Sequence, residues 1–290
     1  MSREPGDGGL NIDLHTHSNR SDGALAPAEL VARAAAAGVE VLALTDHDTV
    51  AGLEEAQHSA GVHALHLVPG VEISASWHSQ AIHVLGLWVD PASTALRSEL
   101  KTQGERRRVR MRKICERLSK QGLPGAELLA AVEAQPGLPT RAHLAKAMVA
   151  GGHVPRADDA FRKYLGSGKS AYLQAEWPAL DIVVGWIHAA GGLASLAHPM
   201  RYTLSATARR RMFGDFTAAG GDALEVVTGA NGAQHAEAVA VLAVKHGLMG
   251  SVGSDFHDPE LTWNPLGRSL KLPDCVTPVW RSHITKAATP

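Results

Sequence analysis

Histidines and carboxylates follow short apolar runs in this sequence. The stretch "DLHTHSNRSDG" (13–23) places His15 and His17 two positions apart at the end of the run "LNIDL" (10–14), with Asp22 shortly after. Side chains two residues apart on an extended strand point the same way, so the two imidazoles can share one metal ion. A single histidine on an apolar run is more often a hydrogen-bonded core residue, so this stretch alone leaves both interpretations open.

The same arrangement recurs along the chain. Aspartate, glutamate or histidine ends or interrupts the runs "VLALTDHD" (41–48), "LHLVPGVE" (65–72), "IHVLG" (82–86), "LASLAH" (193–198) and "GSDFH" (253–257). Histidine and carboxylate ligands without thiolates suit Zn²⁺, Mn²⁺ or Fe. Eight or nine such groups are too many for one ion, so the pattern predicts a site with several metal ions.

The elements that would position these residues are short strands alternating with helices. Seven apolar runs predict strands, and segments such as 27–38 and 235–247 carry apolar residues at helical spacing and end at glycine. This alternation favours a mostly parallel α/β sheet, and in a barrel of that class the carboxyl ends of the strands share one mouth. Residues 99–178 contain no convincing strand. We therefore expect a mainly helical insertion there, between barrel segments 10–98 and 179–275.

Bulk properties limit the class of protein. The 290 residues include 28 Lys and Arg against 29 Asp and Glu, so any basic binding site must be local. Two distant cysteines, Cys115 and Cys275, fit a reduced cytoplasm better than a disulfide scaffold. The chain shows no signal-peptide pattern and no apolar stretch of about 18 residues, so we expect a cytoplasmic protein that does not contact a membrane. Its oligomeric state is not predicted.

Six stretches together resemble the PHP superfamily, named for its polymerase and histidinol phosphatase members. They are "DLHTHSNRSDG", "LALTDHDTVAG", "PGVEIS", "IHVLG", "LAHP" and "GSDFH", in this order. The resemblance implies a distorted (β/α)₇ barrel with three divalent metal ions, Mn²⁺ being expected and Fe or Zn²⁺ the alternatives. It implies one ligand set for each ion: His15, His17, Glu72 and Asp255; Glu72, His83 and His198; and Asp22, His47 and His257.

Such a centre would supply its own nucleophile. Neighbouring metal ions generate hydroxide near neutral pH and hold the attacking and leaving oxygens of a phosphoryl group. A serine or cysteine nucleophile is then unnecessary, and the chain has no GxSxG motif. Asp46 and Asp48 flank His47 and are candidates for orienting imidazoles from behind the ligands, or for capping the following helix.

Within the superfamily, the chain most resembles bacterial nucleoside 3′,5′-bisphosphate phosphatases that also act as 5′→3′ exoribonucleases. Stretches 138–152, 160–172, 190–202 and 220–226 carry this resemblance, which also implies that the insertion covers the barrel mouth. Both reactions break a phosphorus–oxygen bond at a 3′-oxygen, with a 5′-phosphate available as an anchor. We therefore expect a nucleotide or short RNA as substrate, and no DNA.

Three basic residues are candidates for holding the 5′-phosphate. Arg141 and Arg201 adjoin family-like stretches, and a guanidinium binds phosphate with two hydrogen bonds. A surface ion pair is the alternative for each of them, and Lys169 is the third candidate. The run "LGSGKS" around Lys169 is not a P-loop, because Lys163 stands where that motif requires its first glycine.

A basic helix is predicted at residues 99–121, which contain nine Lys or Arg against three Glu. Met111, Ile114 and Leu118 fall at helical spacing, so one face should pack and the rest should be basic. Such a helix either guides an RNA backbone or is an ordinary solvated surface. In the first case, charge reversal at Arg107 and Arg110 would raise KM for RNA.

Three functions remain compatible with the sequence. The favoured one is metal-dependent hydrolysis of the 3′-phosphate of nucleoside 3′,5′-bisphosphates, release of 5′-nucleotides from 5′-phosphorylated RNA in the 5′→3′ direction, or both. The second is a phosphatase for a small phosphomonoester such as histidinol phosphate, which would not need a large basic insertion. The third is a non-catalytic metal- or RNA-binding module, which would not need every ligand position to be filled.

Overall fold

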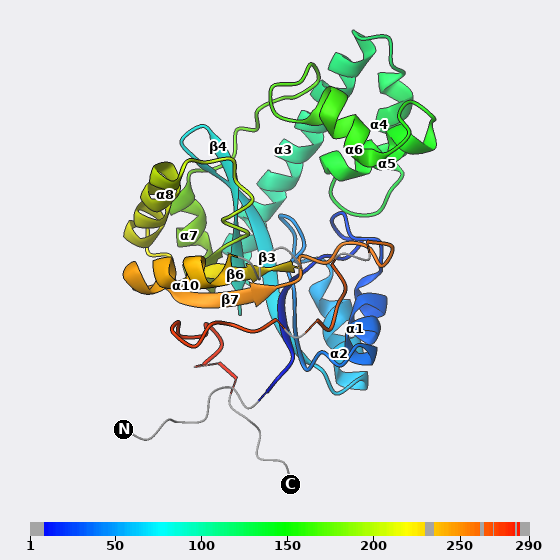
Figure 1. Cartoon of the computed structure of the whole chain (residues 1–290). Coiled ribbons are helices and arrows are strands. Elements are labelled where there is room, and N and C mark those ends of the chain that lie inside the picture. Colours follow the sequence, from blue (N-terminus) through cyan, green and yellow to red (C-terminus); the bar gives the residue numbers. More distant parts are fainter. Residues whose placement is uncertain (1–8, 230–234, 262–263, 269, 282, 285–290) are drawn as a thin grey trace, which may run out of the picture.

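Seven strands form one sheet in chain order and curl into a nearly closed barrel (Figure 1). The structure is a computed structural model and describes residues 9–229, 235–261, 264–268, 270–281 and 283–284. The strands are β1 (Ile12–Thr16), β2 (Val41–Leu44), β3 (His66–Trp77), β4 (Gln80–Leu87), β5 (Leu193–Leu196), β6 (Ala223–Thr228) and β7 (Met249–Gly253). The predicted α/β barrel is confirmed.

The barrel closes between its first and last strands. Thr16 forms a parallel bridge with Phe256. The amide of His17 donates to the carbonyl oxygen of Phe256 at 2.9 Å, and the amide of Asp255 donates to that of His15 at 2.8 Å. These bonds bring the "HTH" segment beside the "SDFH" segment, almost the whole chain length apart.

The strand β4 departs from the parallel order, because it runs antiparallel to both β3 and β5. It forms a hairpin with β3, in which only two residues separate Trp77 from Gln80. The other neighbouring pairs are parallel. The helices on the outside of the barrel are α1 (Pro27–Ala36), α2 (Leu53–Val62), α7 (Leu180–Ala189), α8 (Ala206–Ala218) and α10 (Ala236–Lys245).

A helical lobe lies between β4 and β5 in the chain and stands beside the barrel in Figure 1. It consists of α3 (Thr94–Ser119), α4 (Gly125–Glu133), α5 (Arg141–Ala150), α6 (Ala157–Ala160) and the π-helical turn η1 (Phe161–Leu165). The lobe has its own apolar cluster, which includes Met111, Ile114 and Leu118, so the predicted packed face of α3 is confirmed. Leu96 and Leu100, nearer the start of α3, belong to the barrel core instead.

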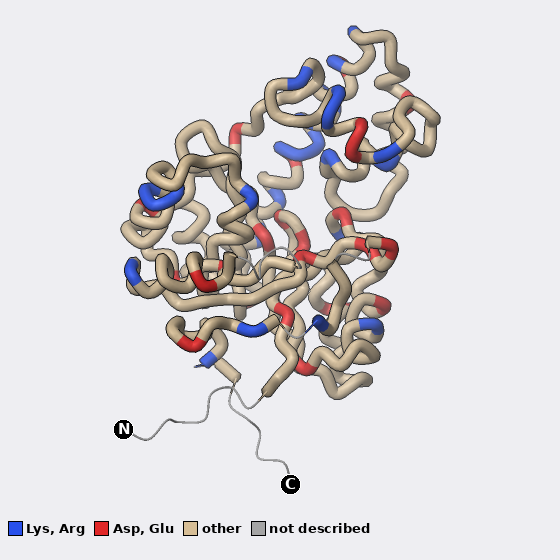
Figure 2. Tube along the Cα trace, viewed as in Figure 1, with Lys and Arg blue, Asp and Glu red and all other residues tan. Residues whose placement is uncertain are grey.

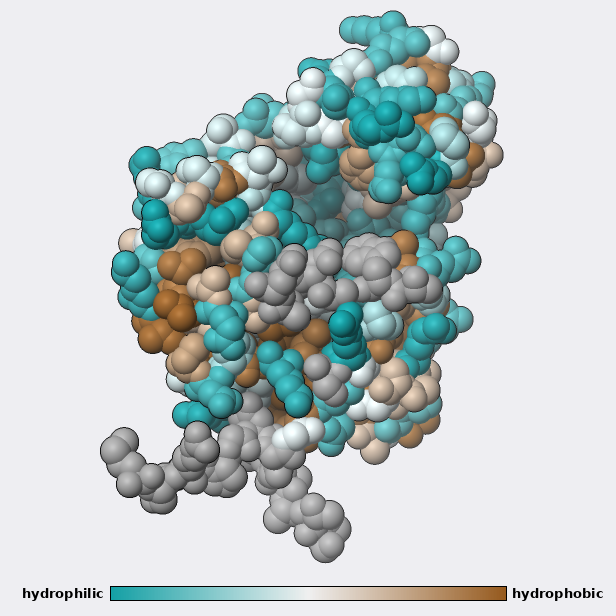
Figure 3. Space-filling view, viewed as in Figure 1, coloured by the Kyte–Doolittle hydropathy of each residue, from teal (hydrophilic) through white to brown (hydrophobic). Residues whose placement is uncertain are grey.

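The lobe touches the barrel at the ends of its strands. The amide of Leu138 donates to the carbonyl oxygen of Arg20 at 3.1 Å, and Nζ of Lys146 lies 3.5 Å from Oδ2 of Asp258. Figure 3 shows a hydrophilic hollow between lobe and barrel. None of the helices in the described ranges combines the length and apolarity needed to cross a membrane.

Candidate metal centre

All nine predicted ligands lie together at the mouth of the barrel. Their imidazoles and carboxylates form one connected network in which each side chain lies within 3.8 Å of another member. Seven of the nine residues are buried; the side chains of His83 and His257 are 28% and 25% exposed. In Figure 2 acidic residues gather at this end of the barrel, facing basic residues of the lobe.

Four ligand atoms, from His15, His17, Glu72 and Asp255, lie close together. Nε2 of His15 lies 3.1 Å from Nε2 of His17, 3.4 Å from Oε2 of Glu72 and 3.3 Å from Oδ1 of Asp255. Nε2 of His17 lies 3.3 Å from the same Glu72 oxygen and 3.2 Å from the same Asp255 oxygen. A tetrahedron with metal–ligand bonds of about 2.0–2.1 Å has edges of about 3.3–3.4 Å, so these five distances are close to those around a metal ion.

Glu72 is the central residue of the network. Its Oε1 lies 2.9 Å from Nδ1 of His83 and 2.9 Å from Nε2 of His198. Its Oε2 lies 2.8 Å from Nδ1 of His47, yet neither of these two buried atoms has a hydrogen-bond partner. Unpaired buried polar atoms are costly, and a shared cation would satisfy both of them. Both carboxylate oxygens of Glu72 are thus available as metal ligands.

A third group of ligand atoms forms around Asp22. Its Oδ1 lies 3.3 Å from Nε2 of His257 and 3.8 Å from Nε2 of His47, and this buried oxygen also has no hydrogen-bond partner. His17 offers a ring nitrogen to the same group, with all of these atoms within 4.8 Å of one another. The residues present therefore fit divalent metal ions in donor type, in spacing and in unpaired lone pairs.

The electrostatics of the centre favour a cation. Burial raises the pKa of Glu72, Asp22 and Asp255, but the surrounding imidazoles outweigh it and hold all three pKa values well below the usual range. Burial lowers the pKa of His17, but the adjacent carboxylates of Asp255 and Glu72 raise it overall to about 10. Burial lowers the pKa of His47 to about 4. Ionised carboxylates in a buried site attract cations, and a metal ion would replace protons on the imidazoles.

Glu225, on β6, is a supporting residue that the sequence interpretation missed. Its Oε1 accepts a hydrogen bond from Nδ1 of His15 at 2.9 Å, and its Oε2 accepts one from the amide of His198. This carboxylate is 1% exposed, so it sets the ring orientation and tautomer of His15. The signal was available, because "ALEVVT" is an otherwise apolar strand with a single acid at its centre.

Asp46 acts on the ligands through serines. Its carboxylate accepts hydrogen bonds from Oγ of Ser18 at 2.6 Å and from Oγ of Ser21 at 2.6 Å. Oγ of Ser21 lies 3.4 Å from Nδ1 of His17, so Asp46 holds the residue next to that ring. Burial raises the pKa of Asp46 itself.

The proposal that Asp48 orients an imidazole is corrected by the structure. Its carboxylate instead accepts hydrogen bonds from Nε of Arg107 at 2.7 Å and from the amide of Ser74 at 2.8 Å. Arg107 also donates to Oγ of Ser74 and is only 8% exposed. Asp48 therefore fixes α3 to the barrel, and Arg107 is not the exposed RNA-guiding residue that the basic helix suggested.

Backbone strain occurs at the same place. The φ angles of Asp48, His198 and Asp255 are 51°, 32° and 56°. A left-handed conformation costs a residue other than glycine roughly 1–2 kcal/mol, and such residues concentrate at functional sites. Each of the three residues lies two to four positions after the end of a strand, in the turn that sets the direction of its side chain.

The three anchor candidates have different surroundings. Arg201 is paired with Asp255 through Nη1 and is 44% exposed. Arg141, at the start of α5, donates to the carbonyl oxygen of Leu165 at 3.1 Å, and its guanidinium lies 5.8 Å from the ring centroids of Phe161 and Tyr172. Lys169 is exposed on the lobe.

A further arginine stands beside Arg141. Arg110, on α3, donates to the carbonyl oxygen of Leu173 from Nε and Nη2, at 3.0 and 2.8 Å. Burial lowers the pKa of Arg110 to about 10, and the charges of Arg141 and Arg107 act in the same direction. Among the described residues no carboxylate lies within ion-pair distance of Arg110 or Arg141. Two partly buried cations without a counter-charge favour an anion.

This barrel and site define a PHP-type protein, and the comparisons agree. The model of the PHP domain matches residues 13–166, so the chain belongs to the PHP family. The chain is 44% identical to a 5′-3′ exoribonuclease of Haemophilus influenzae, with 92% of this chain and 97% of that protein covered. It is 42% identical to a 3′,5′-nucleoside bisphosphate phosphatase of Chromobacterium violaceum, covering 93% and 95%. A solved Chromobacterium violaceum structure, described as an amidohydrolase with bound sulfate and no metal, superposes with a TM-score of 0.88, 40% identity and coverage of 94% and 95%.

Proposed function

We propose that this protein is a metal-dependent phosphoesterase with two related activities. It hydrolyses the 3′-phosphate of nucleoside 3′,5′-bisphosphates and releases 5′-nucleotides from 5′-phosphorylated RNA in the 5′→3′ direction. The observation that carries the proposal is the set of ligand atoms of His15, His17, Glu72 and Asp255 at metal-type spacing. Relatives that match nearly the whole chain carry these two activities in their names.

The centre would hold three divalent ions, Mn²⁺ being our first choice. One would lie among His15, His17, Glu72 and Asp255, a second among Glu72, His83 and His198, and a third among Asp22, His47 and His257; His17 stands close enough to serve the third as well. Bound there, the ions would activate water as the nucleophile and neutralise charge on the reacting phosphate.

The residues of the chain itself orient the substrate. Arg201 lies against Asp255, so its guanidinium is positioned for an oxygen of the reacting phosphate. Arg110 and Arg141 would hold the 5′-phosphate, because they are cations without a carboxylate partner in the described part of the chain. Segment 99–178, which contains them, would form the domain that covers the mouth.

One assay tests the proposal. The purified protein with Mn²⁺ should hydrolyse adenosine 3′,5′-bisphosphate and a 5′-phosphorylated RNA oligomer well above histidinol phosphate, and His15→Ala should abolish all turnover. Equal rates on the three substrates would contradict the substrate class. Loss of activity with full metal content in His15→Ala would contradict the role of that ligand.

The 5′-phosphate anchor needs a separate comparison. The wild type should prefer adenosine 3′,5′-bisphosphate to adenosine 3′-monophosphate, because only the former carries the anchoring group. Arg141→Ala should raise KM for the bisphosphate about 10- to 100-fold and leave the monophosphate unchanged, since charge-assisted hydrogen bonds contribute about 1.5–3 kcal/mol. Lys163→Ala, at an exposed position of the lobe, is the matched comparison. An equal effect of Arg141→Ala on both substrates would contradict the anchor.

A further inference from the structure

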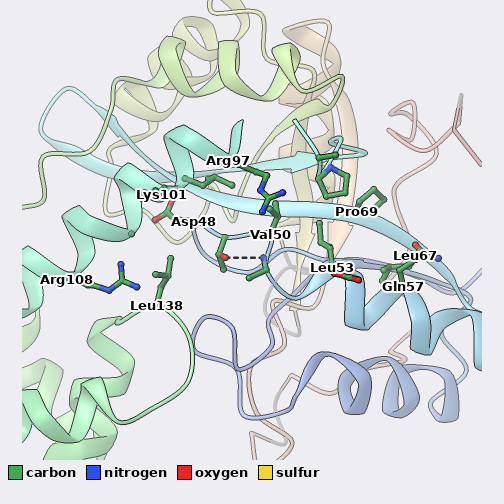
Figure 4. A pocket seen from close by; sticks show the side chains of 17 residues that line it. Asp48, Val50, Leu53, Gln57, Leu67, Pro69, Arg97, Lys101, Arg108 and Leu138 are labelled. Carbon is green, nitrogen blue, oxygen red and sulfur yellow. Dashed lines mark hydrogen bonds between the residues drawn. The ribbon is translucent and has the colours of Figure 1, made fainter. Parts of the chain in front are cut away.

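A groove with a volume of about 980 Å³ runs along the outside of the barrel, between α3 and the segment that links β2 to α2 (Figure 4). Arg97, Lys101 and Arg108 of α3 line one side. Val50 and Leu53 stand on the other side, and β3 contributes apolar side chains between them. The function proposed above does not use this groove.

The charge of the groove comes from one face of α3. Arg97, Lys101 and Arg108 are four and seven residues apart, which places them in one stripe along the helix, about 17 Å long at 1.5 Å per residue. All three are exposed. Gly104 lies between them, where a Cβ atom would stand 3.2 Å from Cδ2 of Leu138, so the lobe segment approaches the helix closely.

Little acidic charge opposes this stripe. Arg108 is paired with Glu105 at 3.1 Å, but no carboxylate in the described residues lies within ion-pair distance of Arg97 or Lys101. Of the two acidic residues that line the groove, Asp48 is already neutralised by Arg107, which leaves Glu54. The groove therefore carries net positive charge.

One end of the groove adjoins the segments that carry the ligand candidates. Asp48, at this end, directly follows the ligand candidate His47. Leu138 also lines this end, and its amide donates to the carbonyl oxygen of Arg20, two residues before the ligand candidate Asp22. This end is therefore the part of the groove nearest to the ligand candidates in the chain.

We propose that the groove binds the single-stranded RNA that lies 3′ of the reacting phosphate. The inference rests on the proposed function: when the 5′ end occupies the metal centre, the rest of the strand must leave the mouth. The cationic stripe matches the charge of its phosphates, and the apolar wall offers contact to riboses and bases. None of the 17 lining residues is aromatic, so the binding does not depend on base stacking or on sequence.

The test is a charge reversal on the stripe, with a matched reversal at Arg112 of α3 and at Lys120, which directly follows the helix. The variant Arg97→Glu/Lys101→Glu is compared with Arg112→Glu/Lys120→Glu, two exposed positions that do not line the groove. The first should raise KM about tenfold for a 5′-phosphorylated decamer and make KM less dependent on salt. KM for adenosine 3′,5′-bisphosphate should stay within about twofold for both variants, because a single nucleotide does not reach the groove.

Each other result overturns the proposal. If both variants raise the decamer KM equally, the effect is overall charge and not the groove; if neither does, the strand takes another path. If the bisphosphate KM rises in parallel, the stripe acts through the metal centre. Failure of the proposed function can be distinguished from failure of the groove proposal, because the wild type would then hydrolyse neither substrate. Fluorescence anisotropy of the labelled decamer would measure RNA binding in the same variants.

Discussion

Glu225 and His15 are 210 positions apart in the chain and joined by a hydrogen bond of 2.9 Å. The carboxylate holds Nδ1 of the ring, which leaves Nε2 free to face the other ligand atoms. We predict that Glu225→Gln weakens metal binding about 10- to 100-fold, as for other residues that support metal-bound imidazoles. Titration of the metal-free protein with Mn²⁺ measures this, with Glu237→Gln on the exposed face of α10 as control. An unchanged affinity would remove Glu225 from the centre.

The pair Asp48 and Arg107 should matter for stability. Both side chains are buried, and replacing one leaves the other charge without its partner. Breaking such a pair costs about 3–5 kcal/mol, so Asp48→Asn should lower the free energy of unfolding by about that amount in urea with chelator present. Asp258→Asn, which breaks the more exposed contact with Lys146, should cost at most about 1 kcal/mol. Equal costs would contradict the structural role of Asp48.

Gly253 should tolerate no larger residue. A Cβ atom there would stand 2.2 Å from Cβ of His15 and 2.7 Å from Oε1 of Glu225, so either β1 or β7 must move. Gly253→Ala is expected to lower both the metal content and the melting temperature. Gly61→Ala on α2, where nothing lies within 4 Å of the added atom, should leave both unchanged or raise the melting temperature slightly. Normal metal content in Gly253→Ala would show that the sheet adapts.

Removal of metal should destabilise the fold. Ions that bind only the native state contribute about 2.7 kcal/mol per site at a hundredfold excess over Kd, so chelation should lower the melting temperature by at least about 5 °C. Elemental analysis of the protein before chelation should find close to three ions per chain. A metal content below one ion per chain, together with a melting temperature that chelation leaves unchanged, would contradict the proposed metal centre.

The two cysteines should differ in reactivity. Cys115 is buried in the lobe, and burial raises the pKa of its thiol to about 11, whereas Cys275 is exposed. A thiol reagent at pH 8 should label one cysteine rapidly in the folded protein and both in denaturant. Rapid labelling of two thiols without denaturant would mean that the apolar cluster of the lobe opens.

The sequence predicted every strand in the described residues and the clustering of the nine His, Asp and Glu side chains, because both depend on local patterns. Apolar runs mark the strands, and a ligand at the end of a parallel strand is placed by the strand itself. The end of β3 was harder to predict. The apolar run that predicts this strand ends at Glu72, yet β3 continues to Trp77, where it pairs with β4. The direction of β4 depends on the short hairpin that follows from this extension.

Long-range pairs were the part that could not be predicted. Arg107 lies in a charged segment of the kind that usually faces solvent. Its burial depends on its contact with Asp48, 59 residues earlier, which the local sequence does not reveal. The charge pattern of α3 did not distinguish Arg107 from Arg97 or Lys101. The 3.6-residue period predicts the face of the helix on which a residue lies. It does not predict which other element packs against that face, because this depends on the tertiary fold.

The closure of β1 against the segment after β7 also bears on how the protein could be divided. The candidate ligands extend from His15 to His257, and the two ends of this range meet at the Thr16–Phe256 bridge, so neither half of the chain carries the whole set. Two separately expressed halves would therefore regain activity only by reassembling.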